Sequence, residues 1–187
     1  CELEEIPIEP YNRGDKKEQQ IELGPDYLNQ IWFDLGTNSV VSQNDKYDWD
    51  LAFDCKDTAV AIYLNTGIGM KVSVVDATTL DAEIDLDQLE FRADISTGNP
   101  DSVMLKDLAR THQLAIVDRG VDLNGESLGY LRLQVEMLAG NQKYQVTYAS
   151  LDLRQKHTME IEKRKGYAKT YLSFDWAEQR NIEPLEA

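Results

Sequence analysis

The sequence contains few of the residues that form disulfide frameworks and metal centres, because its 187 residues include only two cysteines and two histidines. Two cysteines build no disulfide framework, and a zinc site of the usual kind needs three or four His or Cys ligands. The segment Thr66–Met70 holds two glycines but lacks the third glycine and the following helix of a phosphate loop. No Gly-x-Ser-x-Gly elbow of a serine hydrolase is present. We therefore predict a binding protein and not an enzyme.

Basic residues are also scarce, and this limits the kinds of partner. The chain has 34 acidic and 19 basic residues, which gives a formal charge of −15. Nucleic-acid binding depends on Lys and Arg that neutralise phosphates, so this balance argues against it. It also disfavours electrostatic attraction to an anionic lipid surface. No apolar run reaches the roughly 18 residues that a transmembrane helix needs.

The first residue, Cys1, suggests a lipid anchor. A bacterial lipoprotein begins with an acylated cysteine once its signal peptide has been removed, and the residues that follow here are rich in charge, Pro and Gly. We expect Cys1 to be the lipidation site and residues 1–18 to form a flexible tether. The alternative is a sequence boundary that falls at a cysteine by chance. Cys55 then has no partner and is expected to be a small buried apolar residue.

Alternation of apolar and polar residues dominates the rest of the chain and predicts a mainly β, antiparallel, single domain over residues 19–175, followed by an acidic tail over 176–187. Four C-terminal strands are expected to form an antiparallel meander with one solvated face. They are Tyr130–Met137, Lys143–Ala149, His157–Glu162 and Ala168–Phe174.

The N-terminal half predicts shorter strands between Gly, Asn and Asp turns. They are expected at 20–23, 30–35, 39–42, 49–55, 59–65 and 70–75. Ser102–Arg110 is the best helix candidate, with Asp101 or Ser102 as N-cap. Leu86–Arg92 fits either a strand or a helix, so one or two short helices are expected in all.

Two groups of residues carry a resemblance to a known family. Trp32-Phe33-Asp34-Leu35-Gly36 is followed by Trp49-Asp50-Leu51-Ala52-Phe53 and by the turn Asn65-Thr66-Gly67. This order is similar to the N-terminal signature of the HmuY family of haem-binding lipoproteins, and Lys143–Tyr148 resembles the closing strands of that family. Within the motif, we expect Trp49, Leu51 and Phe53 to share one buried face of a strand.

The resemblance implies an all-β fold and export as a lipoprotein on the outer-membrane surface of a Bacteroidetes cell, beside a TonB-dependent receptor. It also implies a haem cofactor held by two axial side chains, histidines or methionines, in the second half of the chain. In that family, one of the two ligands normally lies just before the strand expected here at Tyr130–Met137, but residues 115–127 contain neither His nor Met. The family's ligand pair therefore does not carry over residue by residue.

Three residues are the candidate ligands that remain. His112 and Met104 are the first choice, because they flank the end of the candidate helix, and His157 is the reserve. His157 is expected on the apolar face of its strand with Met159 and Ile161, where it could equally be a satisfied pocket or core histidine. Two functions stay open. The protein binds haem or a related tetrapyrrole, or it is a surface lipoprotein of the same fold that binds another ligand or protein.

Overall fold

The computed structural model describes residues 14, 16–56, 59–97 and 99–185. Within these residues the chain forms eleven strands and one short α-helix, so the expected mainly β class is confirmed. The α-helix is α1 (Leu108–Thr111). The strands are β1 (Asn29–Asp34), β2 (Ser39–Asp45), β3 (Leu51–Asp54), β4 (Ile62–Leu64), β5 (Lys71–Val75), β6 (Leu114–Asp118), β7 (Tyr130–Met137), β8 (Lys143–Ser150), β9 (Lys156–Glu162), β10 (Lys169–Ser173) and β11 (Glu178–Arg180).

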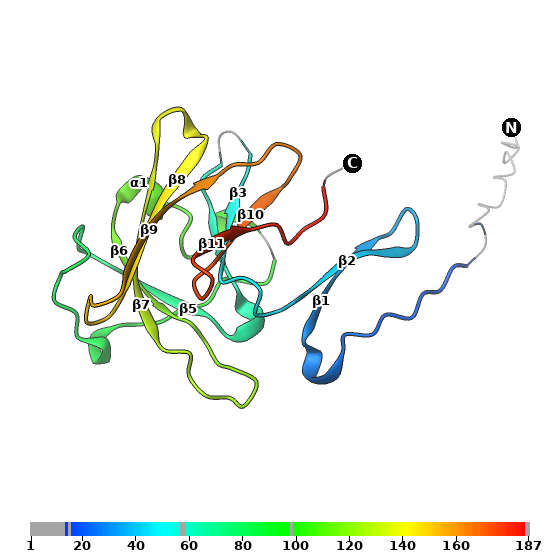
Figure 1. Ribbon diagram of the computed structural model, residues 1–187, viewed down its shortest axis with the longest axis horizontal. Coiled ribbons are helices and arrows are strands. Elements are labelled where there is room, and N and C mark those ends of the chain that lie inside the picture. The colour runs from blue at the N-terminus through cyan, green and yellow to red at the C-terminus, as the bar shows by residue number, and fades with distance from the viewer. Residues whose placement is uncertain (1–13, 15, 57–58, 98, 186–187) are drawn as a thin grey trace, which may run out of the picture.

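The strands form three antiparallel sheets (Figure 1). The largest has the order β5-β6-β7-β8-β9, and a four-stranded sheet has the order β11-β10-β3-β4. The third sheet is the hairpin β1-β2, which extends to one side of the two larger sheets (Figure 1). We call the first two the five-stranded sheet and the four-stranded sheet, and the third the hairpin arm.

The two larger sheets pack face to face around one apolar core. Aromatic side chains connect them: the Phe53 and Tyr144 rings lie 5.1 Å apart, and the Tyr148 and Phe174 rings 4.7 Å apart. The hydroxyl groups of both tyrosines donate across the gap, Tyr144 to the carbonyl oxygen of Asp54 at 3.0 Å and Tyr148 to that of Phe174 at 3.2 Å. Buried tyrosines need such partners for their polar ends, so the pairs fix how the sheets face each other.

The expected C-terminal meander is confirmed for three of its four strands. Strands β7, β8 and β9 are neighbours in register, with Val135 opposite Val146 and Val146 opposite Met159. The fourth strand, β10, pairs instead with β3 and β11 in the four-stranded sheet. Local alternation identifies a strand but not its partner, and the prediction of a four-stranded meander was therefore wrong in its last strand.

Two of the observed strands, β6 and β11, were not predicted, and one predicted strand is not observed among the described residues. β6 is buried on both faces from Leu114 to Val117, so its sequence is a continuous apolar run without the alternation that predicts a strand. β11 lies inside the segment expected to be a tail and pairs at Tyr171 with Arg180. The described structure assigns no strand to residues 20–23.

The predicted helix over residues 102–110 is much shorter in the structure. Pro100–Ser102 forms a 3-10 turn capped by the side chain of Asn99, and α1 spans only Leu108–Thr111. The proposed caps at Asp101 and Ser102 were thus wrong. The apolar side expected for this segment is nevertheless buried, at Val103, Leu105 and Leu108.

The Trp49 side chain lies on the opposite side of the four-stranded sheet from Leu51 and Phe53, so the prediction of one shared face was wrong. Leu51 and Phe53 are fully buried in the main core. Trp49 precedes β3, and its ring packs edge-on against Tyr171 at 5.1 Å, in a smaller cluster on the outer side of the sheet. The period of two holds only within the strand, which begins at Leu51.

Candidate functional site

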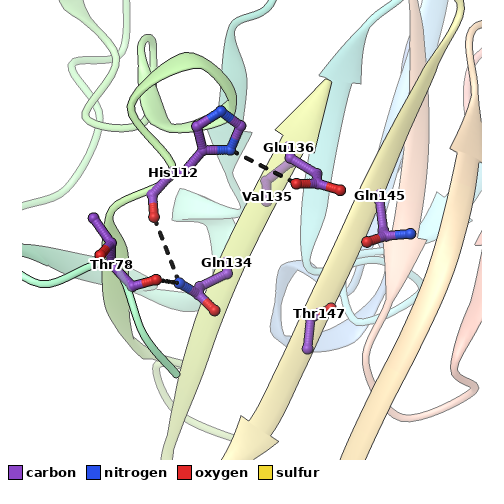
Figure 2. A pocket seen from close by; sticks show the side chains of 7 residues that line it. All are labelled: Thr78, His112, Gln134, Val135, Glu136, Gln145 and Thr147. Carbon is purple, nitrogen blue, oxygen red and sulfur yellow. Dashed lines mark hydrogen bonds and ion pairs between the residues drawn. The ribbon is translucent and has the colours of Figure 1, made fainter. Parts of the chain in front are cut away.

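His112 lies on the outer face of the five-stranded sheet, away from the core (Figure 2). It ends α1 in the left-handed conformation, with φ of 54°. Its Nδ1 is 3.8 Å from Glu136 Oε2, and its carbonyl oxygen accepts a hydrogen bond of 3.5 Å from Gln134. These residues border a hollow of about 240 Å³ whose other walls include Thr78, Gln145 and Thr147. The hollow is polar and holds a carboxylate beside the imidazole.

Met104 does not line this hollow. Its side chain packs against the main core, and its backbone N–H donates to Asp94 Oδ1 at 2.7 Å. The structure therefore does not bring the first-choice pair, His112 and Met104, together around one hollow. The Cys55 thiol accepts a hydrogen bond from the N–H of Arg164, and burial raises the pKa of this thiol. Cys1, the predicted lipidation site, lies outside the described residues.

His157 occupies a different environment, at the open end of the core. Its strand β9 presents the predicted face toward the inside, and exposure increases along that face from Ile161, which is buried, through Met159 to His157, which is exposed. The imidazole stacks nearly parallel on Tyr148, with ring centroids 5.0 Å apart and an angle of 16° between the planes. Tyr148 is the cross-strand partner of His157 in the register of β8 and β9.

A second hollow of about 220 Å³ opens beside this stacked pair. Leu131 and Phe174 supply apolar walls, and Arg119 and Asp175 supply charge. Burial raises the pKa of Tyr148 to about 12, so its hydroxyl stays protonated and remains a donor to the Phe174 carbonyl oxygen. We call this space the His157 hollow.

The Arg119 guanidinium at this hollow is held by two carboxylates. Arg119 Nη2 is 3.1 Å from Asp50 Oδ1, and Nη1 is 2.9 Å from Asp175 Oδ1. Asp50 is 2% exposed, and its other oxygen accepts a 2.7 Å hydrogen bond from the backbone N–H of Phe174. Burial raises the pKa of Asp50, while Arg119 and the Phe174 N–H act in the opposite direction.

The backbone after Arg119 explains why the arginine is fixed in place. Gly120 has φ of +80°, and a Cβ at this position would lie 2.0 Å from the carbonyl oxygen of Ile68. The same oxygen accepts a hydrogen bond of 2.9 Å from the N–H of Val121. Only glycine allows this close approach, so the residues that follow β6 run tightly along the turn at Ile68. Sequence reasoning missed Arg119, although a basic residue next to a glycine at a strand end is visible in the sequence.

A family comparison identifies the relationship of the chain. The family model described as HmuY protein matches residues 26–177. The chain belongs to the HmuY family. This family is associated with haem binding, and its members are binding and transport proteins typically exposed at the cell surface. Comparison with curated proteins and with solved structures gave no match.

Two further properties of the described residues bear on the site. They contain no group of three or more His, Cys, Asp and Glu side chains arranged to hold a metal ion. None of the helices in this part of the chain is both long enough and apolar enough to cross a lipid bilayer.

The buried pair of Asp50 and Arg119 generates a prediction about stability and pH. Arg119→Met should reduce the free energy of unfolding by about 3–5 kcal/mol at pH 7, because it leaves the Asp50 charge buried without its partner. The pKa of Asp50 should then rise further above its unfolded value. The folded state would bind the additional proton, so the loss should shrink as the pH falls toward 4.5. Urea unfolding at the two pH values measures this.

The control for this experiment is Asp175→Asn, which removes only the partner that is 63% exposed. Asp175→Asn should reduce the free energy of unfolding by less than about 1 kcal/mol. A loss for Arg119→Met that is the same at both pH values would contradict the assignment of the effect to the Asp50 charge.

Proposed function

We propose that this member of the HmuY family binds haem or a related tetrapyrrole at the His157 hollow, and delivers it at the outer-membrane surface to a TonB-dependent receptor. The observation that supports this most is the accessible imidazole of His157 beside apolar walls and a cation. Family membership supports the same ligand class.

The residues of the His157 hollow suit the chemistry of haem. No hydrogen bond or ion pair to the His157 ring is found among the described residues, so its exposed imidazole can ligate iron. Leu131 and Phe174 can contact the apolar macrocycle, and Arg119 can pair with a propionate. The Tyr148 hydroxyl is already used as a donor to the Phe174 carbonyl oxygen, so His157 is the better placed ligand. Bound haem would supply the iron that the imidazole ligates.

The hollow beside His112 suits haem less well. Its lining side chains are polar except for Val135, and no cation among them offsets the Glu136 carboxylate beside the imidazole, which would repel a propionate. Burying a macrocycle against such groups costs free energy without hydrogen bonds in return. In the His157 hollow, the Asp175 carboxylate is instead paired with Arg119. We therefore favour His157, the reserve candidate from the sequence, over the pair of His112 and Met104.

The size of the His157 hollow predicts the type of complex. Ligand pockets that enclose a small molecule usually measure about 300–1,000 Å³, whereas this hollow measures about 220 Å³. A porphyrin would thus be held along one face or edge, with its remainder open to solvent or to a partner. Such a site would release its ligand readily, which suits transfer to a receptor.

A haem titration followed by absorbance tests the proposal. His157→Ala should weaken haem binding by at least about tenfold, because it removes a direct iron ligand. Even mutation of a residue that only hydrogen-bonds a metal ligand typically lowers affinity about 10- to 100-fold. His112→Ala and Met104→Leu are the matched controls and should leave the affinity unchanged. One protein nitrogen should give a high-spin ferric spectrum. Loss of binding in His112→Ala but not in His157→Ala would overturn the assignment and favour the sequence-based pair.

The second candidate function is a surface module that binds another ligand or protein. The exposed apolar residues of the hairpin arm support it, since Leu35 is 88% exposed and Val41 50% exposed. Scattered exposed apolar side chains are common, but a concentration on one projecting hairpin is typical of a contact surface. No saturable haem binding at micromolar concentration would favour this function over the first.

We also propose that Cys1 carries the lipid anchor. The residue type at this position and the charged segment behind it support the proposal. Cys1→Ala in the full precursor should move the protein from the membrane fraction to the soluble fraction. Retention of the variant in membranes after a high-salt wash would contradict it.

A further inference from the structure

A third hollow lies between the hairpin arm and the outer side of the four-stranded sheet. It measures about 470 Å³ and is the most apolar of the hollows described here. The arm contributes Ile31 and Trp32, and the residues before and within the sheet contribute Trp49, Tyr63 and Tyr171. We call it the aromatic hollow. It is separate from the His157 hollow, with which it shares no lining residue.

Three of the four large rings have their polar atoms already bonded. Trp49 Nε1 donates to Gln30 Oε1 at 2.7 Å, and Trp32 Nε1 donates to Asn44 Oδ1 at 3.1 Å. The Tyr171 hydroxyl donates to Glu183 at 3.2 Å. The ring faces are therefore available for contact, while the donors of Trp32, Trp49 and Tyr171 are not. This arrangement favours an apolar ligand over one that needs many hydrogen bonds.

One cation stands at the wall of this apolar space. The ammonium group of Lys169 lies 4.2 Å from the centre of the Tyr63 ring. In the described part of the chain, no carboxylate lies within ion-pair distance of this group, although the protein carries a net charge of −15. A lysine held over a ring face can still attract an anion, because its charge is not neutralised by the ring.

We propose that the aromatic hollow is a binding site for an amphipathic organic anion, with an apolar body and one carboxylate or sulfonate group. The apolar body lies against the lining rings Trp32, Trp49 and Tyr63, and the anionic group pairs with Lys169. The site needs no metal and does not depend on haem binding at His157. The two hollows would thus hold ligands independently.

Two probes that differ by one charge test this site. The anion is 1-anilinonaphthalene-8-sulfonate, and the neutral counterpart is N-phenyl-1-naphthylamine. Trp176→Phe should serve as background, since Trp176 is 67% exposed and is the only other tryptophan in the chain. Emission then comes from Trp32 and Trp49 alone. Its saturable quenching reports binding of the probe to the protein, and the variants below assign that binding to the hollow.

The charge variant is Lys169→Gln, and Lys165→Gln is its matched control, because Lys165 is exposed and does not line the aromatic hollow. Lys169→Gln should lower the affinity for the sulfonate probe about two- to fivefold and leave the affinity for the neutral probe unchanged. Lys165→Gln should change neither. Added salt should lower the affinity only for the sulfonate probe, because it screens the attraction between opposite charges. Tyr63→Ser should lower the affinity for both probes. If its near-ultraviolet circular dichroism and its urea unfolding midpoint match those of the parent, the lower affinity comes from the lost ring contact and not from unfolding.

Three results would overturn the proposal. The first is the absence of saturable quenching by either probe. The second is equal affinity of the sulfonate probe for the parent and for Lys169→Gln, which would show that Lys169 does not bind the anionic group. The third is quenching by a neutral oligosaccharide such as maltotriose but by neither naphthalene probe, which would make the hollow a glycan site.

Discussion

The buried carboxylate of Asp50 is the interaction on which the arrangement of residues around the His157 hollow depends. Its two oxygens reach two different parts of the chain, Arg119 after β6 and the backbone N–H of Phe174 after β10. The residue itself directly precedes β3. One side chain thereby joins the five-stranded sheet to the four-stranded sheet at the place where the core opens. A buried carboxylate is costly unless it is fully paired, so its position leaves little freedom to its partners.

The chemistry of the His157 hollow follows from that constraint. Phe174 is fixed by its N–H and by its carbonyl oxygen, which accepts from Tyr148. Tyr148 in turn supports the imidazole of His157. Arg119 is held at the same opening by Asp50 and Asp175. The hollow therefore combines apolar walls, one accessible nitrogen and one cation that is paired with Asp50 and Asp175.

The sequence predicted best those strands in which one face is wet, although the largely buried β3 and β10 were also located. Alternation located β7, β8 and β9 correctly, and it placed His157 on the face that leads into the core. It failed for β6, because a strand covered on both faces shows no alternation. It also failed for the partner of β10, since pairing with β3 is a contact across more than a hundred residues. Trp49 was misplaced because the chain departs from strand geometry just before Leu51.

The candidate site was predictable only in part, for a related reason. Histidine is scarce, so the two imidazoles were easy to nominate, but their surroundings depend on tertiary packing. The sequence could not show that His112 lies beside Glu136 on a polar outer face, whereas His157 lies beside an apolar opening. It also could not show that Asp50, inside the family's most recognisable motif, would bind Arg119 from 69 positions away.

The central claim is that the ligand site lies at the His157 hollow, and nuclear magnetic resonance with a diamagnetic haem analogue tests it most directly. Gallium protoporphyrin IX should be added to protein labelled with ¹⁵N and ¹³C, and the backbone and imidazole signals followed. The account predicts that the largest shifts occur at Arg119, Tyr148, His157 and Phe174, with a change at the His157 ring nitrogens. Shifts concentrated at His112, Gln134 and Thr147 would contradict it.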